Sequence, residues 1–98
     1  MQVALAHLAA LAAPARLGAL RILWDGGEHC VCALIARLGV TQSRMSRHMQ
    51  RLKAAGLVID RRDAQWVRYR LNPALPPEQR AVLAAIMAAC AAEERAAA

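Results

Sequence analysis

The 98-residue sequence contains no phenylalanine, and aromatic side chains make up only 3% of it. A core built from large aromatic rings is therefore excluded, and Leu, Ile, Val and Met must do the packing. Much of the 58% apolar content is alanine, which favours helix while filling little core volume. Together these features predict a small, mostly helical protein.

Acidic residues are also scarce, because seven Asp and Glu stand against thirteen Lys and Arg, for a formal net charge of +6. All of these cations except Lys53 are arginines, which suit bidentate contacts to phosphate or guanine. Such a balance indicates a polyanionic partner. An anionic membrane surface is the competing partner, but the cations gather around positions 44–70 and do not follow one amphipathic helix. We therefore expect no membrane partner.

The sequence has no long apolar run and too few cysteines for a disulfide framework. No stretch reaches the roughly 18 apolar residues that a membrane span needs, and three cysteines is an odd number. The first fifteen residues lack the basic start of a secretory signal, and His7 interrupts their apolar run. These absences predict a cytoplasmic protein with reduced thiols.

The most informative stretch runs from Thr41 to Leu52. Thr41 is a favourable helix N-cap, and Met45, Met49 and Leu52 recur at i, i+4 and i+7 as one apolar stripe. The opposite face and its flanks contain no acid, which suits a helix lying in the major groove of DNA. A solvated basic face is the alternative. The polar positions are Ser43, Arg44, Ser46, Arg47, Gln50 and Arg51.

The segments on either side favour DNA recognition. A short helix precedes Gly39-Val40-Thr41, so residues 31–55 have the pattern of a helix-turn-helix with the second helix as reader. After Gly56 the apolar period changes to two, which predicts a hairpin, or wing, over 57–71. Its arginines Arg61, Arg62 and Arg68 are expected to contact the DNA backbone or minor groove, although an ordinary solvated hairpin is the alternative.

The two ends of the chain are predicted to form a dimer interface. Residues 1–13 form a helix that is apolar on most sides, so a partner chain or the C-terminal helix must cover it. Pro14 begins a second helix, and a last helix over 78–95 carries an apolar stripe on an alanine-rich surface. Residues 1–98 are thus predicted to be one winged helix-turn-helix domain, mainly α with a small β-hairpin, with about five helices, dimeric through its terminal helices.

With these pieces in order, the sequence resembles the ArsR-type (ArsR/SmtB) metalloregulators, a family of winged helix-turn-helix repressors. The resemblance implies a cytoplasmic homodimer that leaves double-stranded operator DNA when a metal or metalloid binds, as in the arsenite- and antimonite-sensing branch. It also implies that Gln42, Ser43, Ser46, Arg47 and His48 belong to the reading helix. It covers roughly positions 8–72 and rests on Glu28-His29-Cys30-Val31-Cys32, Val40-Thr41-Gln42-Ser43, Ser46-Arg47-His48, Leu52-Lys53-Ala54-Ala55-Gly56-Leu57-Val58 and Trp66-Val67-Arg68-Tyr69-Arg70-Leu71.

Cys30 and Cys32 form a Cys-x-Cys pair at the start of the short helix before the turn. A helix N-terminus and the neighbouring His29 favour thiolates, and two thiolates suit a soft ion such as trivalent arsenic or antimony. Side chains two residues apart diverge on a regular helix. Joint ligation therefore requires either that the first turn unwinds or that Cys30 lies outside the helix.

The sequence has no third cysteine next to the Cys-x-Cys pair. The arsenite-sensing pattern often has a third cysteine three residues after the second, and that position is Ile35 here. Cys90 is the only other thiol, so it is either the third ligand or a packed interface residue. The zinc and cadmium sensors of the family use histidines and carboxylates on the last helix, which has no histidine in this chain.

The leading hypothesis is a transcriptional repressor released by As(III) or Sb(III) at Cys30, Cys32 and Cys90, with no catalytic cofactor. The alternative is a thiol-redox or sulfide-responsive repressor that pairs Cys30 or Cys32 with Cys90. A dithiol reductase would leave the basic helix unexplained, so no enzyme is predicted. A plain dimeric interaction protein would lack salt-dependent binding to DNA.

Overall fold

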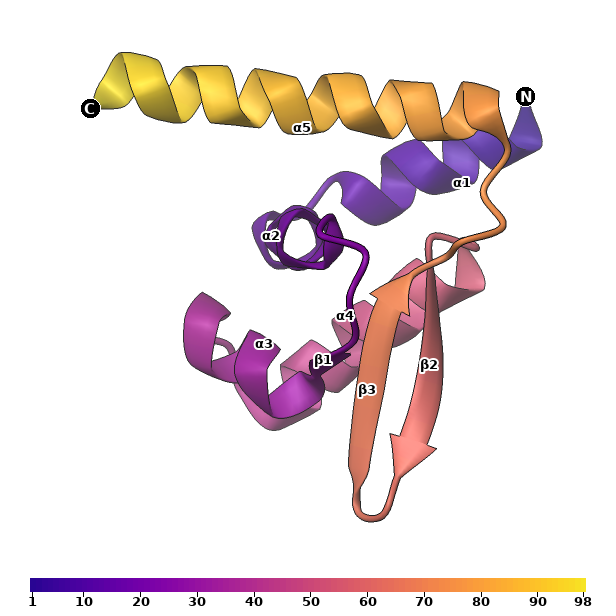
Figure 1. Cartoon of the computed structure of the whole chain (residues 1–98), viewed down its shortest axis with the longest axis vertical. Helices are drawn as coiled ribbons and strands as arrows, with labels where there is room; N and C mark the ends of the chain where they lie inside the picture. The colour runs from indigo at the N-terminus through magenta and orange to yellow at the C-terminus, as the bar shows by residue number, and fades with distance from the viewer.

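The computed structural model describes all 98 residues and contains five helices and one three-stranded antiparallel sheet (Figure 1). The predicted fold class, mainly α with a small β-hairpin, is confirmed. The long helix α5 crosses one end of the molecule beside α1, and the β2–β3 hairpin projects from the other end. The elements are α1 (Gln2–Leu11), α2 (Pro14–Leu23), β1 (His29–Cys30), α3 (Val31–Leu38), α4 (Gln42–Ala54), β2 (Val58–Asp63), β3 (Trp66–Leu71) and α5 (Pro77–Ala97).

Helices α3 and α4 form the predicted helix-turn-helix pair. The Thr41 hydroxyl accepts a hydrogen bond from the Arg44 N–H at 3.4 Å and so caps α4. Met45, Met49 and Leu52 are fully buried, as their spacing predicts. At the end of α3, Gly39 has a φ of 66°, a left-handed conformation that glycine adopts without strain and that lets the chain turn into α4.

The sheet contains one strand that the sequence did not reveal. Strands β2 and β3 pair from Val58 opposite Leu71 to Asp63 opposite Trp66, which gives the predicted wing. The missed strand, β1, pairs with the other edge of β3, so that Cys30 lies opposite Arg68. Two residues are too short to show an apolar period, which is why sequence reasoning read them as a connection.

Helices α1 and α5 leave much of their apolar surface uncovered. Helix α5 has 21 residues but buries only Leu83. It is held by the Arg80 guanidinium, 5.0 Å from the centre of the Trp24 ring, and by an ion pair between Arg21 and Glu94. Three apolar residues of α1 and one of α5 are at least half exposed, namely Val3, Leu5, Leu8 and Val82. We call these four residues the terminal apolar patch.

No single helix is long and apolar enough to cross a bilayer, and only α1 and α2, a pair bent by 102°, have that length and composition together.

Candidate functional site

Most of the residues expected to read DNA lie exposed on one side of α4. None of them is engaged by a carboxylate, because the five ion pairs of the chain involve other residues. This face therefore presents hydroxyl, amide and guanidinium groups to solvent. The exposed residues are Gln42, Ser43, Arg44, Ser46, Arg47 and Gln50.

Two of the residues expected to read DNA, Gln50 and His48, are hydrogen-bonded to other elements of the chain. The amide of Gln50 donates a hydrogen bond to the Tyr69 hydroxyl of β3 at 3.4 Å. His48 Nδ1 lies 3.0 Å from a terminal nitrogen of Arg16 in α2. Burial, followed by the charges of the surrounding arginines, lowers the pKa of His48. Both residues stay predicted DNA contacts, and in the structure each is hydrogen-bonded to a neighbouring element.

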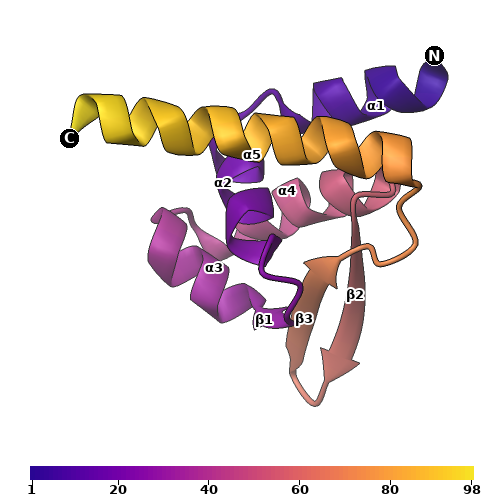
Figure 2. The same ribbon diagram turned by 45° about the horizontal axis from the view of Figure 1, so that its top comes forward.

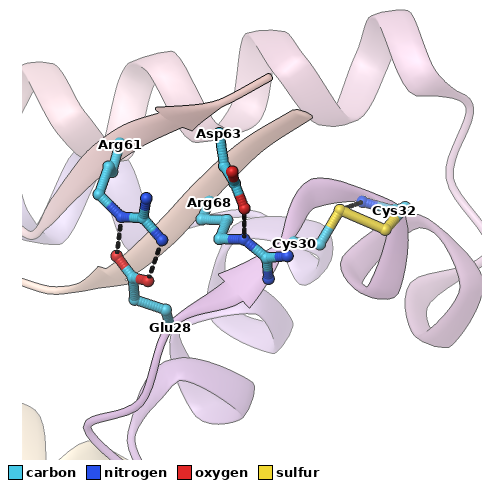
Figure 3. A network of polar contacts seen from close by, with 6 residues as sticks. All are labelled: Glu28, Cys30, Cys32, Arg61, Asp63 and Arg68. Carbon is cyan, nitrogen blue, oxygen red and sulfur yellow. Dashed lines mark hydrogen bonds and ion pairs between the residues drawn. A yellow bond between two sulfur atoms is a disulfide. The ribbon is translucent and has the colours of Figure 1, made fainter. Parts of the chain in front are cut away.

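Two of the three wing arginines that are expected to contact DNA form ion pairs with carboxylates (Figure 3). Arg61 donates from two nitrogens to the two oxygens of Glu28, at 2.8 and 2.9 Å, and this pairing lowers the pKa of Glu28. Arg68 donates to Asp63 at 2.9 Å. Arg62 is exposed and has no ion pair. Of the predicted wing contacts, only Arg62 is free of a carboxylate in the structure.

The two adjacent cysteines converge at the start of α3. Cys30 is the N-cap, with extended backbone angles of φ −64° and ψ 142°, and its sulfur accepts a hydrogen bond from the Cys32 N–H at 3.2 Å. Cys30 therefore lies outside the helix, which meets one of the two conditions for joint ligation. The structure joins Cys30 and Cys32 in a disulfide across a Cα separation of 5.1 Å (Figure 3). This corrects the expectation of reduced thiols, and the extended N-cap explains how the two sulfurs meet.

Cys90 is a free, half-buried thiol on α5. It lines a recess with Leu17, Gly18 and Arg21 of α2, while the disulfide lies at β1, on the other side of α2 (Figures 1 and 2). The chain contains no group of three or more His, Cys, Asp and Glu side chains that could hold a metal ion. Within one chain, Cys90 is thus not brought to the other two cysteines.

His29 is directed to a carboxylate and not to the thiols. Its Nε2 lies 2.9 Å from a carboxylate oxygen of Asp25, and the Gly27 N–H donates to the same carboxylate. The hydrogen bond from Gly27, followed by that from His29, lowers the pKa of Asp25. This contact holds the loop before β1 in place.

Cys30 and Cys32 adjoin both elements that are predicted to contact DNA. Strand β1 joins Cys30 to the wing through its pairing with Arg68, and Glu28, two residues earlier, holds Arg61. On the other side, α3 follows Cys30 directly and leads through a three-residue turn into α4. A change of backbone conformation at Cys30 can therefore reach the wing and the reading helix.

Residues 13–60 match the family model described as "Bacterial regulatory protein, arsR family". The arsenical resistance operon repressor of Escherichia coli (strain K12) is 44% identical over 66 residues, which is 67% of this chain and 56% of that protein. The solved structure of reduced HlyU from Vibrio cholerae N16961 has a TM-score of 0.74 at 35% identity, covering 87% of this chain and 85% of that one.

A solution structure from Mycobacterium bovis, a homodimeric winged helix-turn-helix DNA-binding domain described as a possible ArsR-family regulator, is similar as well. Its TM-score is 0.74 at 27% identity, covering 91% of this chain and 79% of that one. This chain spans about half the length of the arsenic-resistance regulators that it matches in sequence. The matched residues include the helix-turn-helix and both cysteines at the start of α3. The chain therefore belongs to the ArsR family of bacterial regulatory proteins.

Proposed function

We propose that this protein is a transcriptional repressor that leaves its operator DNA when As(III) or Sb(III) binds the thiolates of Cys30 and Cys32. The observation that carries the proposal is the convergence of the two sulfurs at the start of α3, directly before the helix-turn-helix. Relatives named as an arsenic resistance transcriptional regulator and an arsenical resistance operon repressor support it.

The position of Cys30 fits such a ligand. Because Cys30 is an extended N-cap, its sulfur and that of Cys32 are close enough to share one soft atom once the disulfide is reduced. Cys90 as third ligand remains a prediction, and it requires a thiol from a partner subunit or a rearrangement of α5. Two thiolates at the N-cap are sufficient for the proposal.

Release of DNA follows from the two connections of the thiol pair. A ligand held by both sulfurs replaces the Cys30 cap contact with Cys32, so the first turn of α3 must adjust. That adjustment shifts α4 through the turn and shifts β3 through its pairing with β1. By linkage, bound DNA weakens ligand binding by the same factor as the ligand weakens DNA binding.

We infer that the repressor is a homodimer assembled through α1 and α5. The four side chains of the terminal apolar patch are at least half exposed on these two helices, and the similar Mycobacterium bovis domain is homodimeric. A two-fold dimer would place two reading helices on successive half-sites of the operator.

The test is a titration of reduced protein on duplex DNA selected by this protein from a random library. We expect micromolar arsenite or antimonyl ion to release the protein, as measured by fluorescence anisotropy. DNA binding without release, up to high micromolar arsenite, would contradict the inducer and leave the DNA-binding function intact. No salt-dependent binding to any duplex would contradict the whole proposal.

The disulfide between Cys30 and Cys32 favours a second candidate, a thiol-redox repressor. Oxidation by a peroxide would remove two electrons and two protons from the pair and reduce the peroxide to water. In this candidate the redox-active disulfide joins Cys30 to Cys32 and leaves Cys90 free. It therefore differs from the alternative predicted from the sequence, in which Cys30 or Cys32 pairs with Cys90. Release of DNA by peroxide or polysulfide, with no effect of arsenite on reduced protein, would favour it.

Substitution of the reading face should remove specificity while leaving the fold intact. Ser43→Ala and Arg47→Ala alter exposed side chains that pack against nothing in the core. If Arg47 reads a base, its loss should cost the selected duplex about 1–3 kcal/mol relative to a scrambled duplex. Competition anisotropy with both duplexes measures the ratio. Wild-type ratios in both variants would show that another face reads the DNA.

Removal of the Glu28 carboxylate should strengthen DNA binding without regard to sequence. Glu28→Gln raises the formal net charge by one and releases Arg61 from its bidentate pair. If Arg61 then contacts a phosphate, the slope of log affinity against log salt should steepen by about 0.9 per subunit. Glu93→Gln makes the same charge change on α5 without breaking an ion pair. Equal effects of the two variants would refute a specific role for the Glu28–Arg61 pair.

A further inference from the structure

Four arginines and one histidine surround a recess beside the reading helix. The recess has a volume of about 280 Å³, and no hydrophobic residue lines it. Three of the arginines and the histidine follow one side of α4, and the fourth arginine comes from the first turn of α2. The lining residues are Arg16, Arg44, Arg47, His48 and Arg51.

No carboxylate compensates these charges. Five of the seven acidic residues are used in ion pairs with other basic side chains. The remaining two, Glu78 and Glu93, belong to α5. The recess is therefore a concentrated positive region whose counter-charge must come from outside the chain.

Arg16 is held in a fixed position in the recess, unlike an arginine on the open surface. Its side chain is more than nine-tenths buried, and its Nε donates to the carbonyl oxygen of Ala10 at the end of α1. One terminal nitrogen contacts His48 Nδ1. The other terminal nitrogen forms no hydrogen bond within the chain, although it carries two donors.

The contact with Arg16 also fixes the state of His48. A guanidinium can only donate, so His48 Nδ1 must accept and the ring proton lies on Nε2. Burial first, and then the charges of Arg16, Arg44, Arg47 and Arg51, lower the pKa of this ring. Those four arginines are the charged groups that face the ring from α2 and α4. An anion in the recess would offset their repulsion and favour the protonated ring.

We propose that this recess binds a phosphate group of the DNA backbone, with Arg16, Arg44 and Arg51 as its main donors. The proposal rests on the proposed DNA-binding function and adds a site to it. Phosphate offers several acceptor oxygens, which match the forked donors of guanidinium groups. Arg44 and Arg51 are seven residues apart on one flank of α4. When the opposite flank faces the bases, this flank lies along the edge of the groove, beside the DNA backbone.

This site divides the residues of α4 into two roles. Ser43 belongs to the exposed face directed at base edges, whereas Arg44 and Arg51 position the duplex without reading it. Arg16 anchors the same phosphate from α2, so that one backbone contact fixes the angle between the duplex and the reading helix. Arg16 was not among the predicted DNA contacts, and the sequence placed Arg51 only on the flank of the reading face. His48 becomes a positioning residue that orients Arg16.

The test compares Arg51→Ala with Arg95→Ala, an equal charge change near the end of α5. We expect Arg51→Ala to weaken binding to selected and scrambled duplexes by the same factor, about three- to tenfold at moderate salt. The slope of log affinity against log salt concentration should become shallower by about 0.9 for each recess occupied. Arg95→Ala should stay close to wild type. Loss confined to the selected duplex, or no difference from Arg95→Ala, would overturn the proposal.

The His48 pKa, followed by NMR, provides the second measurement. It should rise when duplex DNA is added to wild-type protein and rise less in Arg51→Ala. A rise with millimolar inorganic phosphate, but none with DNA, would show a site for a free anion and overturn the backbone assignment. If wild-type protein binds no duplex at all, the proposed function itself fails. If it binds and Arg51→Ala is unchanged, only the recess assignment fails.

Discussion

Reduced protein that carries Cys30→Ser or Cys32→Ser is expected to bind operator DNA normally and to lose its response to arsenite. A single remaining thiolate cannot chelate the metalloid. Loss of an outer-shell partner already costs about 10–100-fold in metal affinity, so loss of a direct ligand should cost more than about 100-fold. Anisotropy of labelled operator DNA, with arsenite added stepwise to reduced protein, measures the response.

The fold should tolerate both substitutions. Cys30 acts as the N-cap of α3 by accepting a hydrogen bond from the Cys32 N–H, and a serine hydroxyl is a preferred acceptor at that position. Cys32 is exposed. Unchanged DNA affinity therefore serves as the internal control. A full arsenite response in either variant would contradict the two-thiolate site.

Cys90→Ser is the matched variant for the third-ligand prediction. It should retain the response if Cys30 and Cys32 are the whole ligand set. A loss as large as that of Cys30→Ser would instead require Cys90 to reach the pair, which the structure does not show within one chain. X-ray absorption of the arsenic-bound protein would then count three sulfur neighbours instead of two.

The oxidation state of the pair separates the two candidate inducers. A disulfide has no thiolate to offer, so oxidised protein should ignore arsenite until a reductant is added. For a metalloid-responsive repressor, oxidised protein remains on DNA. For a redox-responsive repressor, oxidation alone releases DNA, and reduction restores binding.

Local patterns predicted the fold well because they depend on neighbours in the sequence. The stripe of Met45, Met49 and Leu52 requires only the helical period, and the hydroxyl of Thr41 caps the helix that it precedes. The wing followed from alternation in β3, where Tyr69 and Leu71 are buried.

The site was predicted less completely because its contacts join residues that are distant in the sequence. A helical wheel treats α4 as isolated, so it could not show that α2 holds His48 or that β3 holds Gln50. Likewise, Glu28 precedes Arg61 by 33 residues. Arg16 was missed because an arginine is expected on the surface unless hydrogen-bond partners compensate the cost of its burial. Its partners, the Ala10 carbonyl and His48, lie on other elements.

Val82→Glu should convert the protein to a folded monomer that has lost most of its operator affinity. Val82 is 56% exposed, so a carboxylate there costs little in the isolated chain. It lies beside a narrow apolar recess of about 110 Å³ between α1 and α5, which a second copy could fill. In a dimer interface the same carboxylate would be buried without a cation, which is strongly unfavourable.

The loss of affinity should be large because the two reading helices of the proposed dimer bind the operator together. Once one half-site is occupied, the second binds as an intramolecular step, and this avidity is worth about 10²–10⁴ in affinity. Val82→Glu should lose that factor, while Val82→Ala, which adds no charge, should weaken the dimer less. Sedimentation velocity measures the subunit state, circular dichroism the fold and anisotropy the affinity. A dimeric Val82→Glu with wild-type affinity would place the interface elsewhere than on α1 and α5. A wild-type monomer that binds one half-site would show that the terminal apolar patch has another occupant.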